Sequence, residues 1–291
     1  PEEIIVGGVY GNGQFRLAAI EPAQLTFTHI TDAAAVESPL AVDTSLTEVY
    51  WNSLNGQPLP ATLQEAREYA DRLEERYGVT ILLSAQAQEA CDAVWDATIT
   101  TTDQWPLEDE PHAIARMLEA LDRTLALYPD GFFRQMKNTM GEGGVRFMPV
   151  GHIENAVNAI GLTYETYGWQ NIYIDVTIDA FEGTICHEIW HATENEILSR
   201  DYTAFNWDDW NALNPAGFTY WNDSGDYDRY DARWTMFDNG EGVYFVDSYA
   251  KLAAQEDRAR IMEYFMVHED EAGLLIQSDA IRQKLMWMCR A

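Results

Sequence analysis

The chain has 291 residues, 47% of them hydrophobic, and a formal net charge of −30 from 48 acidic and 18 basic side chains. A chain of this size buries enough apolar surface for one large domain or two small ones. The excess of negative charge argues against binding to nucleic acid or to anionic membranes, and no apolar run is long enough to span a bilayer.

The first 57 residues have the least regular pattern. The segment from Val9 to Phe15 contains Gly-Asn-Gly between apolar residues, which predicts a hairpin turn. A polar, Ala-rich stretch follows it. We therefore expect residues 1–57 to form an N-terminal appendage to a larger domain that spans residues 58–291.

From Thr62 the pattern becomes regular. Apolar residues at helical spacing predict a helix from Leu63 to Tyr77 that stops at Gly78, and residues 79–83 predict a strand. A second helix is expected after Asp109, with Pro111 in its first turn and its end before the Pro-Asp-Gly of 129–131. Residues 145–150 predict another strand.

Residues 171–179 alternate apolar and polar side chains, which predicts a strand with one buried face. The apolar spacing then becomes helical from Phe181 to Ala192, with Asp179 as a possible cap. A strand beside such a helix can bind an extended peptide by backbone pairing if it is an exposed edge. The sequence does not decide whether it is one.

His187, Glu188 and His191 form a His-Glu-x-x-His motif in this helix. The two histidines lie one turn apart on one face, so both imidazoles can bind one tetrahedral Zn²⁺. Glu188 then flanks the open ligand position, where a carboxylate can take a proton from water as the water attacks a carbonyl. The motif predicts a catalytic zinc site with Glu188 as general base, which indicates a metallopeptidase.

A zinc site of this kind needs a third protein ligand, and no further histidine follows His191 at a short spacing. Among the carboxylates, the best candidate lies in the segment from Phe245 to Ala259, which is followed by apolar residues at helix-like spacing.

A Ser-Tyr pair ending at Tyr249, a short polar stretch and Glu256 at the start of a helix, all after the His-Glu-x-x-His motif, resemble the catalytic domain of anthrax lethal factor and its relatives. These are zinc endopeptidases with a glutamate ligand, or gluzincins. The chain also looks like a group of bacterial secreted zinc-peptidase lipoproteins. The resemblance implies that Tyr249 stabilises the oxyanion or donates a proton. It also implies that His187, His191 and Glu256 are the metal ligands and that Glu188 is the general base. Glu256 follows Tyr249 by seven residues, nearly two helical turns, so both side chains could face the metal if this stretch is helical.

The chain departs from this family at several positions. Arg258 and Arg260 stand where relatives of lethal factor tend to carry Phe and a second Glu, and Trp190 replaces a small residue inside the motif. Glu194 follows His191 by three residues on the same side of the helix. It could hydrogen-bond a ligand imidazole, compete as a ligand or be a solvated carboxylate at the helix end.

The acidic segment from Asp223 to Asp231 includes a glycine and several carboxylates, a composition that suits Ca²⁺. It lacks the bidentate Glu that closes an EF-hand loop, so a solvated acidic loop over the cleft is the alternative. The aromatic residues between Phe205 and Trp221 are expected to form the lower wall of that cleft.

Cys91, Cys186 and Cys289 are not spaced for a zinc ribbon. We expect Cys186 to be a small buried apolar residue and not a nucleophile. At most one disulfide can form, and Cys91 with Cys289 is the pairing that we favour. The remaining histidines are isolated in the sequence, and we expect surface or packing roles for them, with His152 reserved because it follows a predicted strand: His29, His112, His152 and His268.

The order of these elements predicts an α+β fold of two lobes, similar to the zincin metallopeptidases. A small mixed sheet with helices would form the upper lobe, about residues 58–196. A mostly helical lower lobe, about residues 197–291, would supply Glu256 and end in a helix near 274–288. The metal would lie in the cleft between the lobes.

We therefore expect a zinc-dependent endopeptidase that acts on peptide or protein substrates and is secreted or anchored at a bacterial cell surface, its leader being absent from this sequence. Three alternatives remain open. The chain could be a zinc enzyme acting on another amide, a catalytically degenerate protein that binds zinc or peptide, or an aromatic-rich surface protein that binds carbohydrate. The substrate and the oligomeric state are not predicted.

Overall fold

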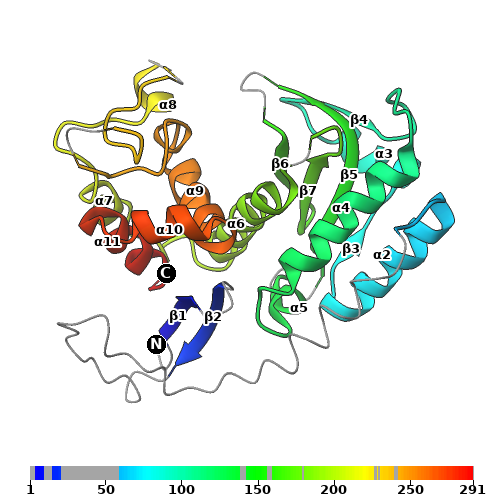
Figure 1. Ribbon diagram of the computed structural model, residues 1–291, viewed down its shortest axis with the longest axis horizontal. Coiled ribbons are helices and arrows are strands. Elements are labelled where there is room, and N and C mark those ends of the chain that lie inside the picture. The colour runs from blue at the N-terminus through cyan, green and yellow to red at the C-terminus, as the bar shows by residue number, and fades with distance from the viewer. Residues whose placement is uncertain are drawn as a thin grey trace.

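The computed structural model shows an α+β fold around a five-stranded mixed sheet, with helices on either side of it and a largely helical part after α6 (Figure 1). No described helix has both the length and the apolar character needed to cross a membrane. The structure describes residues 4–9, 15–20, 59–137, 142–155, 159–178, 180–225, 228, 230–238 and 242–290.

The sheet is centred on β5, which pairs with three other strands. Its first half lies parallel to β3 and its second half antiparallel to β4, so both of these short strands share one edge of β5. On the other edge β5 runs parallel to β7, and β6 lies antiparallel to β7 at the end of the sheet. The strands are β3 (Thr80–Ile81), β4 (Thr98–Thr101), β5 (Gly144–Glu154), β6 (Gly161–Thr166) and β7 (Trp169–Asp175).

The sequence predicted the strand that became β7, but it did not predict β6. The two strands form a hairpin across Tyr167 and Gly168, which have φ angles of 50° and 81°. A two-residue hairpin turn whose twist matches that of the strands requires positive φ at both central residues, a conformation that glycine adopts readily. As a result β7 lies inside the sheet, and β6 is its edge strand.

Of the five helices before the His-Glu-x-x-His motif in the described part of the chain, α2 and α4 form where the sequence predicts them, and the three short helices were not predicted. Thr62 and Glu65 make a capping box at the start of α2, which ends at Gly78 with a φ of 74°. Asp109 caps α4 by accepting a hydrogen bond from the backbone N–H of His112. These helices are α2 (Leu63–Tyr77), η3 (Ser84–Ala87), α3 (Gln88–Asp92), α4 (Glu110–Leu125) and α5 (Phe132–Gln135).

The chain ends in two helices, α10 and α11, where the sequence predicted one. Ser278 caps α11 by accepting a hydrogen bond from the backbone N–H of Ile281, so the predicted helix over residues 274–288 is interrupted. The helices are α6 (Phe181–Arg200), α7 (Trp207–Asn211), α8 (Trp221–Ser224), η4 (Tyr249–Lys251), α9 (Ala254–Val267), α10 (Glu269–Leu275) and α11 (Asp279–Met288).

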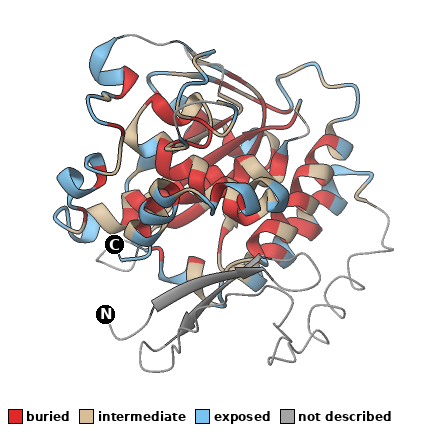
Figure 2. Cartoon of the chain, turned by 60° about the vertical axis from the view of Figure 1, so that its left-hand side comes forward, coloured by how far each residue is buried: buried red, intermediate tan, exposed pale blue. Residues whose placement is uncertain are grey.

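Helix α6 lies between two apolar clusters, so it is buried on opposite faces. Ile185 and Ile189 pack with α2, α4 and one face of the sheet. Trp190 packs with residues of α7, α9, α10 and α11. A helix that is apolar on several sides lies inside a molecule. Figure 2 shows buried residues throughout the centre of this protein.

Two further predictions concern the hairpin near the N-terminus and the disulfide between Cys91 and Cys289. β1 (Ile4–Val9) pairs antiparallel with β2 (Phe15–Ile20) and places Val9 opposite Phe15, as the predicted hairpin requires. The expected disulfide is wrong, because all three cysteines are free and Cys91 is buried against the sheet whereas Cys289 is exposed at the end of α11. α3 and α11 lie on opposite sides of the molecule (Figure 1).

Candidate metal centre

His187 and His191 lie one turn apart on α6, with their Nε2 atoms 3.1 Å apart and their ring centroids 4.8 Å apart. The helix positions them because Ile185 and Ile189, on another face, are fixed in the core around the sheet. His187 is 7% exposed, so its imidazole is held inside the protein. The predicted cap at Asp179 lies outside the described residues.

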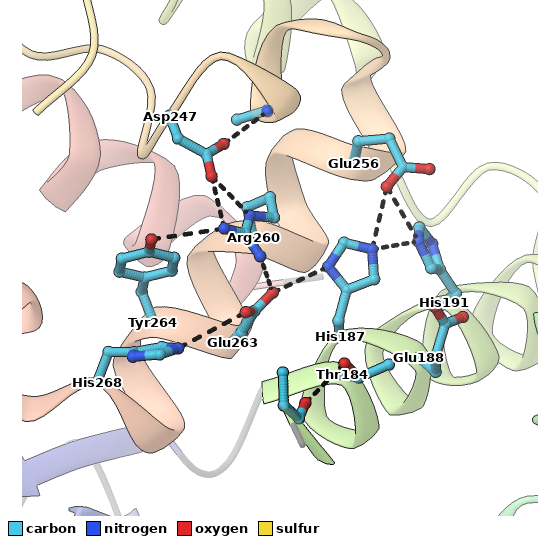
Figure 3. A network of polar contacts seen from close by, with 12 residues as sticks. Thr184, His187, Glu188, His191, Asp247, Glu256, Arg260, Glu263, Tyr264 and His268 are labelled. Atoms are coloured by element: carbon cyan, nitrogen blue, oxygen red, sulfur yellow. Dashed lines mark hydrogen bonds and ion pairs between the residues drawn. The ribbon is translucent and has the colours of Figure 1, made fainter. Parts of the chain in front are cut away.

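Glu256 reaches the same point from α9, where it is the third residue of the helix. Its Oε2 lies 3.0 Å from Nε2 of His187 and 3.5 Å from Nε2 of His191. Helix α9 packs across α6, which brings residues 69 positions apart into contact. The three ligand atoms therefore converge on one point from two helices (Figure 3).

The spacing of these three atoms suits a tetrahedral metal ion. Ligand atoms about 2.0–2.1 Å from zinc lie about 3.3 Å from one another in a tetrahedron. The observed separations of 3.0, 3.1 and 3.5 Å bracket that value. Two imidazoles and one carboxylate also leave a fourth position for water or substrate, the pattern of a catalytic site. Within the described residues, they form the one metal-holding group of three or more such side chains.

The electrostatics of the three ligands favour a positive charge at this point. Burial alone would lower the pKa of His187, but Glu256 and Glu263 outweigh it and raise the pKa to about 10. Burial would raise the pKa of Glu256, but His191 and His187 outweigh it and hold the pKa well below its usual range. The carboxylates around His187 thus favour positive charge at this point, which a metal cation would also supply.

Glu263 lies behind His187 and was not predicted. Its Oε2 is 3.3 Å from the buried Nδ1 of His187, close enough for charge attraction although the angle is not that of a hydrogen bond. The other oxygen of Glu263 faces Nε2 of His268 at 3.6 Å. A carboxylate on the far nitrogen of a ligand imidazole fixes the tautomer and ring orientation that metal binding needs.

Glu188 lies on α6 against the edge strand β6. The Thr163 hydroxyl is 2.7 Å from Oε2 of Glu188 and can donate to it. Gly161 allows this approach, because a Cβ there would lie 2.7 Å from Oε1 of Glu188 and 2.6 Å from Cγ2 of Thr184. Burial raises the pKa of Glu188, and His187 and His191 partly offset that rise.

Tyr249 lies in η4, on the side of the site that Glu256 also lines. Its ring centroid is 6.1 Å from that of His187. Tyr249 lines one pocket of about 550 Å³ together with both histidines, Glu188 and Glu256. The structure thus brings all five predicted site residues to one place, although Tyr249 lies in a short 3₁₀ turn before α9 and not in the same helix as Glu256.

The walls of the pocket come from both sides of α6. Gly161, Leu162 and Thr163 of β6 line one side, and Asn222 and Gln255 line the other. β6 is the last strand of the sheet in the described part of the chain, so its outer edge lies along the pocket. The predicted strand, β7, packs on α6 but lies between β5 and β6, so it is not an exposed edge.

Glu194 does not act as either expected partner of the metal site. Arg258 donates to both of its oxygens, at 2.6 and 2.7 Å, and Trp190 Nε1 donates to one of them at 3.1 Å. Glu194 is also 3% exposed, so it is not a solvated carboxylate. The two arginines that depart from the lethal factor pattern both form ion pairs: Arg258 with Glu194, and Arg260 with Asp247 and Glu263.

The other candidates play structural parts where the structure describes them. The carboxylate of Asp231 lies 2.8 Å from Nζ of Lys251, and several other residues of the proposed calcium loop lie outside the described ranges. His152 stacks on Trp105 and its Nδ1 lies 3.2 Å from Asp175. Cys186 is fully buried, as expected, and burial raises the pKa of its thiol.

Comparisons with protein-family models, with curated proteins and with solved structures find no match to this chain.

Proposed function

We propose that this protein is a zinc-dependent peptidase that hydrolyses peptide bonds with a metal-activated water. One observation carries the proposal: the Nε2 atoms of His187 and His191 and Oε2 of Glu256 converge at tetrahedral spacing in a pocket that also contains Glu188. Two imidazoles and a carboxylate with an open fourth position are typical of catalytic zinc sites in peptidases. His187, His191 and Glu256 would hold the ion.

A zinc ion at this point would supply Lewis acidity and lower the pKa of a coordinated water to about 7. Glu188 would accept the proton of the attacking water and later pass it to the leaving amine. Its buried position favours this role, because burial raises the pKa of the carboxyl toward the operating pH of a general base. The Thr163 hydroxyl would keep one oxygen of Glu188 oriented during both transfers.

Tyr249 would donate a hydrogen bond to the carbonyl oxygen as negative charge develops on it. Its position on the wall opposite β6 supports this role, since the substrate carbonyl would lie between them. The outer edge of β6 would bind the peptide backbone in extended form, because a strand at the end of a sheet has unpaired N–H and C=O groups to offer.

The proposal extends to the architecture and to the setting of the enzyme. The sheet with α2 and α4 would be the upper lobe of a zincin-like fold, and the helices after α6 would be the lower lobe, with the peptide lying between them. Binding of an extended peptide along β6 would suit an endopeptidase. The net charge of −30 fits a secreted or cell-surface protein that is kept in solution by its charge.

The test is cleavage of a mixed peptide library by the zinc-loaded protein, followed by mass spectrometry. Glu188→Gln should remove cleavage and leave zinc bound, because glutamine cannot accept the proton. Glu196→Gln is the matched control on the same helix: Glu196 pairs with Arg200 away from the site, and cleavage should persist. Full cleavage by Glu188→Gln would overturn the mechanism. Zinc binding without cleavage of any peptide would favour a degenerate, binding-only relative.

A further inference from the structure

The turn that carries Tyr249 is fastened by Asp247. One oxygen of Asp247, Oδ1, accepts the backbone N–H of Ala250 at 3.0 Å and so closes the turn. The other oxygen, Oδ2, accepts hydrogen bonds from Nε and Nη2 of Arg260, at 3.1 and 2.5 Å. The position of the turn therefore depends on where α9 holds Arg260.

Arg260 holds a second carboxylate with the rest of its guanidinium group. Its Nη1 forms an ion pair with Oε2 of Glu263, one helical turn further along α9. Nη2 also lies 3.4 Å from the Tyr264 hydroxyl, and the guanidinium lies 5.0 Å from the centre of the Tyr264 ring. The Arg260 side chain is 19% exposed, so little water competes for these contacts. The planar group is thereby fixed on several sides.

The oxygen of Glu263 that binds Arg260 is also the one that faces the metal ligand. Oε2 lies 3.3 Å from Nδ1 of His187. Four side chains thus form a continuous path of polar contacts from the Tyr249 turn to His187: Asp247, Arg260, Glu263 and His187 (Figure 3). Arg260 forms ion pairs with both Asp247 and Glu263 and so joins the two halves of this path.

We propose that Arg260 is a positioning residue that couples the Tyr249 turn to metal binding at His187. Coordination at Nε2 would fix the His187 ring with Nδ1 facing Glu263, and so restrict Glu263, Arg260 and Asp247 behind it. The turn would then be held more firmly when the metal site is occupied. The coupling rests on the proposed metal site, and its effect on catalysis rests on the proposed function.

Zinc affinity tests the coupling without any substrate. We would measure the zinc dissociation constant by competition with a chromogenic chelator for the unmodified protein and for Asp247→Asn. Asp247 contacts no metal ligand, yet its change should weaken zinc binding by about tenfold, the lower range for residues that orient ligands. Arg260→Gln should weaken it at least as much, and Arg260→Lys should restore little, because an ammonium group cannot bind both carboxylates in a fixed plane.

Hydrogen exchange of residues 247–252, with and without zinc, gives the reciprocal measurement. Zinc should slow exchange at the Ala250 amide in the unmodified protein, and Arg260→Gln should abolish that effect. An unchanged zinc dissociation constant in Asp247→Asn, or zinc protection of Ala250 that persists in Arg260→Gln, would overturn the coupling.

Glu194→Gln is the matched control for loss of a buried ion pair. It weakens a different arginine–carboxylate ion pair, that of Arg258 on α9 with Glu194 on α6, in which the Arg258 side chain is 1% exposed. It should lower the melting temperature but leave zinc affinity and exchange at Ala250 unchanged. A zinc defect of equal size in Glu194→Gln would show that any loss of stability weakens the site, and would overturn the specific role of Arg260. Failure of the proposed function shows separately, as unmodified protein that binds no zinc or cleaves no peptide.

Discussion

The immediate surroundings of each site residue determine which part of the chemistry it can perform. His187 and His191 of α6, together with Glu256 of α9, form a group of side chains that could hold one metal ion. Burial raises the pKa of Glu188, whereas the pKa of Glu256 lies well below its usual range because it contacts two imidazoles. The pKa values of two glutamates in one pocket are thus shifted in opposite directions, as the proposed roles of proton acceptor and ionised metal ligand would require.

Most of these site residues could be predicted from the sequence, but Glu263 could not. The His-Glu-x-x-His spacing and the distance from Tyr249 to Glu256 are short sequence patterns. Glu263 has no such pattern, because it is one of 48 acidic residues and is distinguished only by its 3.3 Å approach to His187. Its spacing of seven residues from Glu256, two turns of α9, is the signal that could have suggested it.

Tyr249→Phe tests the expected role of the hydroxyl. Loss of one donor to a developing oxyanion typically lowers kcat by about 10²–10³-fold. We expect a fall of this order in steady-state cleavage, with KM nearly unchanged and zinc still bound, because phenylalanine keeps the ring beside His187. Equal cleavage rates for the variant and the unmodified protein would remove Tyr249 from the mechanism.

At the scale of elements, the approach of β6 to α6 builds the substrate side of the pocket. β6 was missed because the β6–β7 hairpin depends on positive φ angles at Tyr167 and Gly168, and only the glycine signals such a turn in a sequence. The predicted final helix divides into α10 and α11 for a similar reason, since the local cap at Ser278 outweighs helical periodicity. Local backbone geometry decided the first case and a local hydrogen bond the second.

Gly161→Ala tests the contact between β6 and α6. The added Cβ would lie within 3 Å of Glu188 Oε1 and Thr184 Cγ2, so strand and helix must separate. We expect the free energy of unfolding, from urea titration, to fall by about 1–3 kcal/mol, together with a loss of cleavage.

Gly273→Ala is the control, because no atom lies within 4 Å of its added Cβ and the residue is inside α10. Removing a helical glycine should raise stability by about 0.5–1 kcal/mol. Wild-type stability and cleavage in Gly161→Ala would show that β6 is free to move away from Glu188.

At the scale of the whole molecule, the metal site joins the two apolar clusters. His187 and His191 belong to α6, which packs against the sheet, and Glu256 belongs to α9, which packs with α10 and α11. The α+β class and the helices α2 and α4 were predictable from apolar periodicity. The crossing of α6 and α9 was not, because it depends on contacts between distant residues such as Arg258 and Glu194.

Removal of zinc should therefore lower the stability of the whole protein. A ligand that binds only the folded state at a thousand times its dissociation constant adds about 4 kcal/mol, which corresponds to a change in Tm of the order of 10 °C in a protein of this size. Calorimetry with and without a chelator would measure it. The same change of Tm in Glu256→Ala would mean that the metal binds elsewhere.

The central claim is that His187, His191 and Glu256 hold one catalytic zinc ion. Native mass spectrometry of the unmodified protein, Glu256→Ala and Glu188→Gln, purified identically without added metal, tests it most directly. The account predicts one zinc in the unmodified protein and in Glu188→Gln, and zinc that is lost or weakened in Glu256→Ala. Absence of zinc from the unmodified protein, or full retention of zinc in Glu256→Ala, would contradict it.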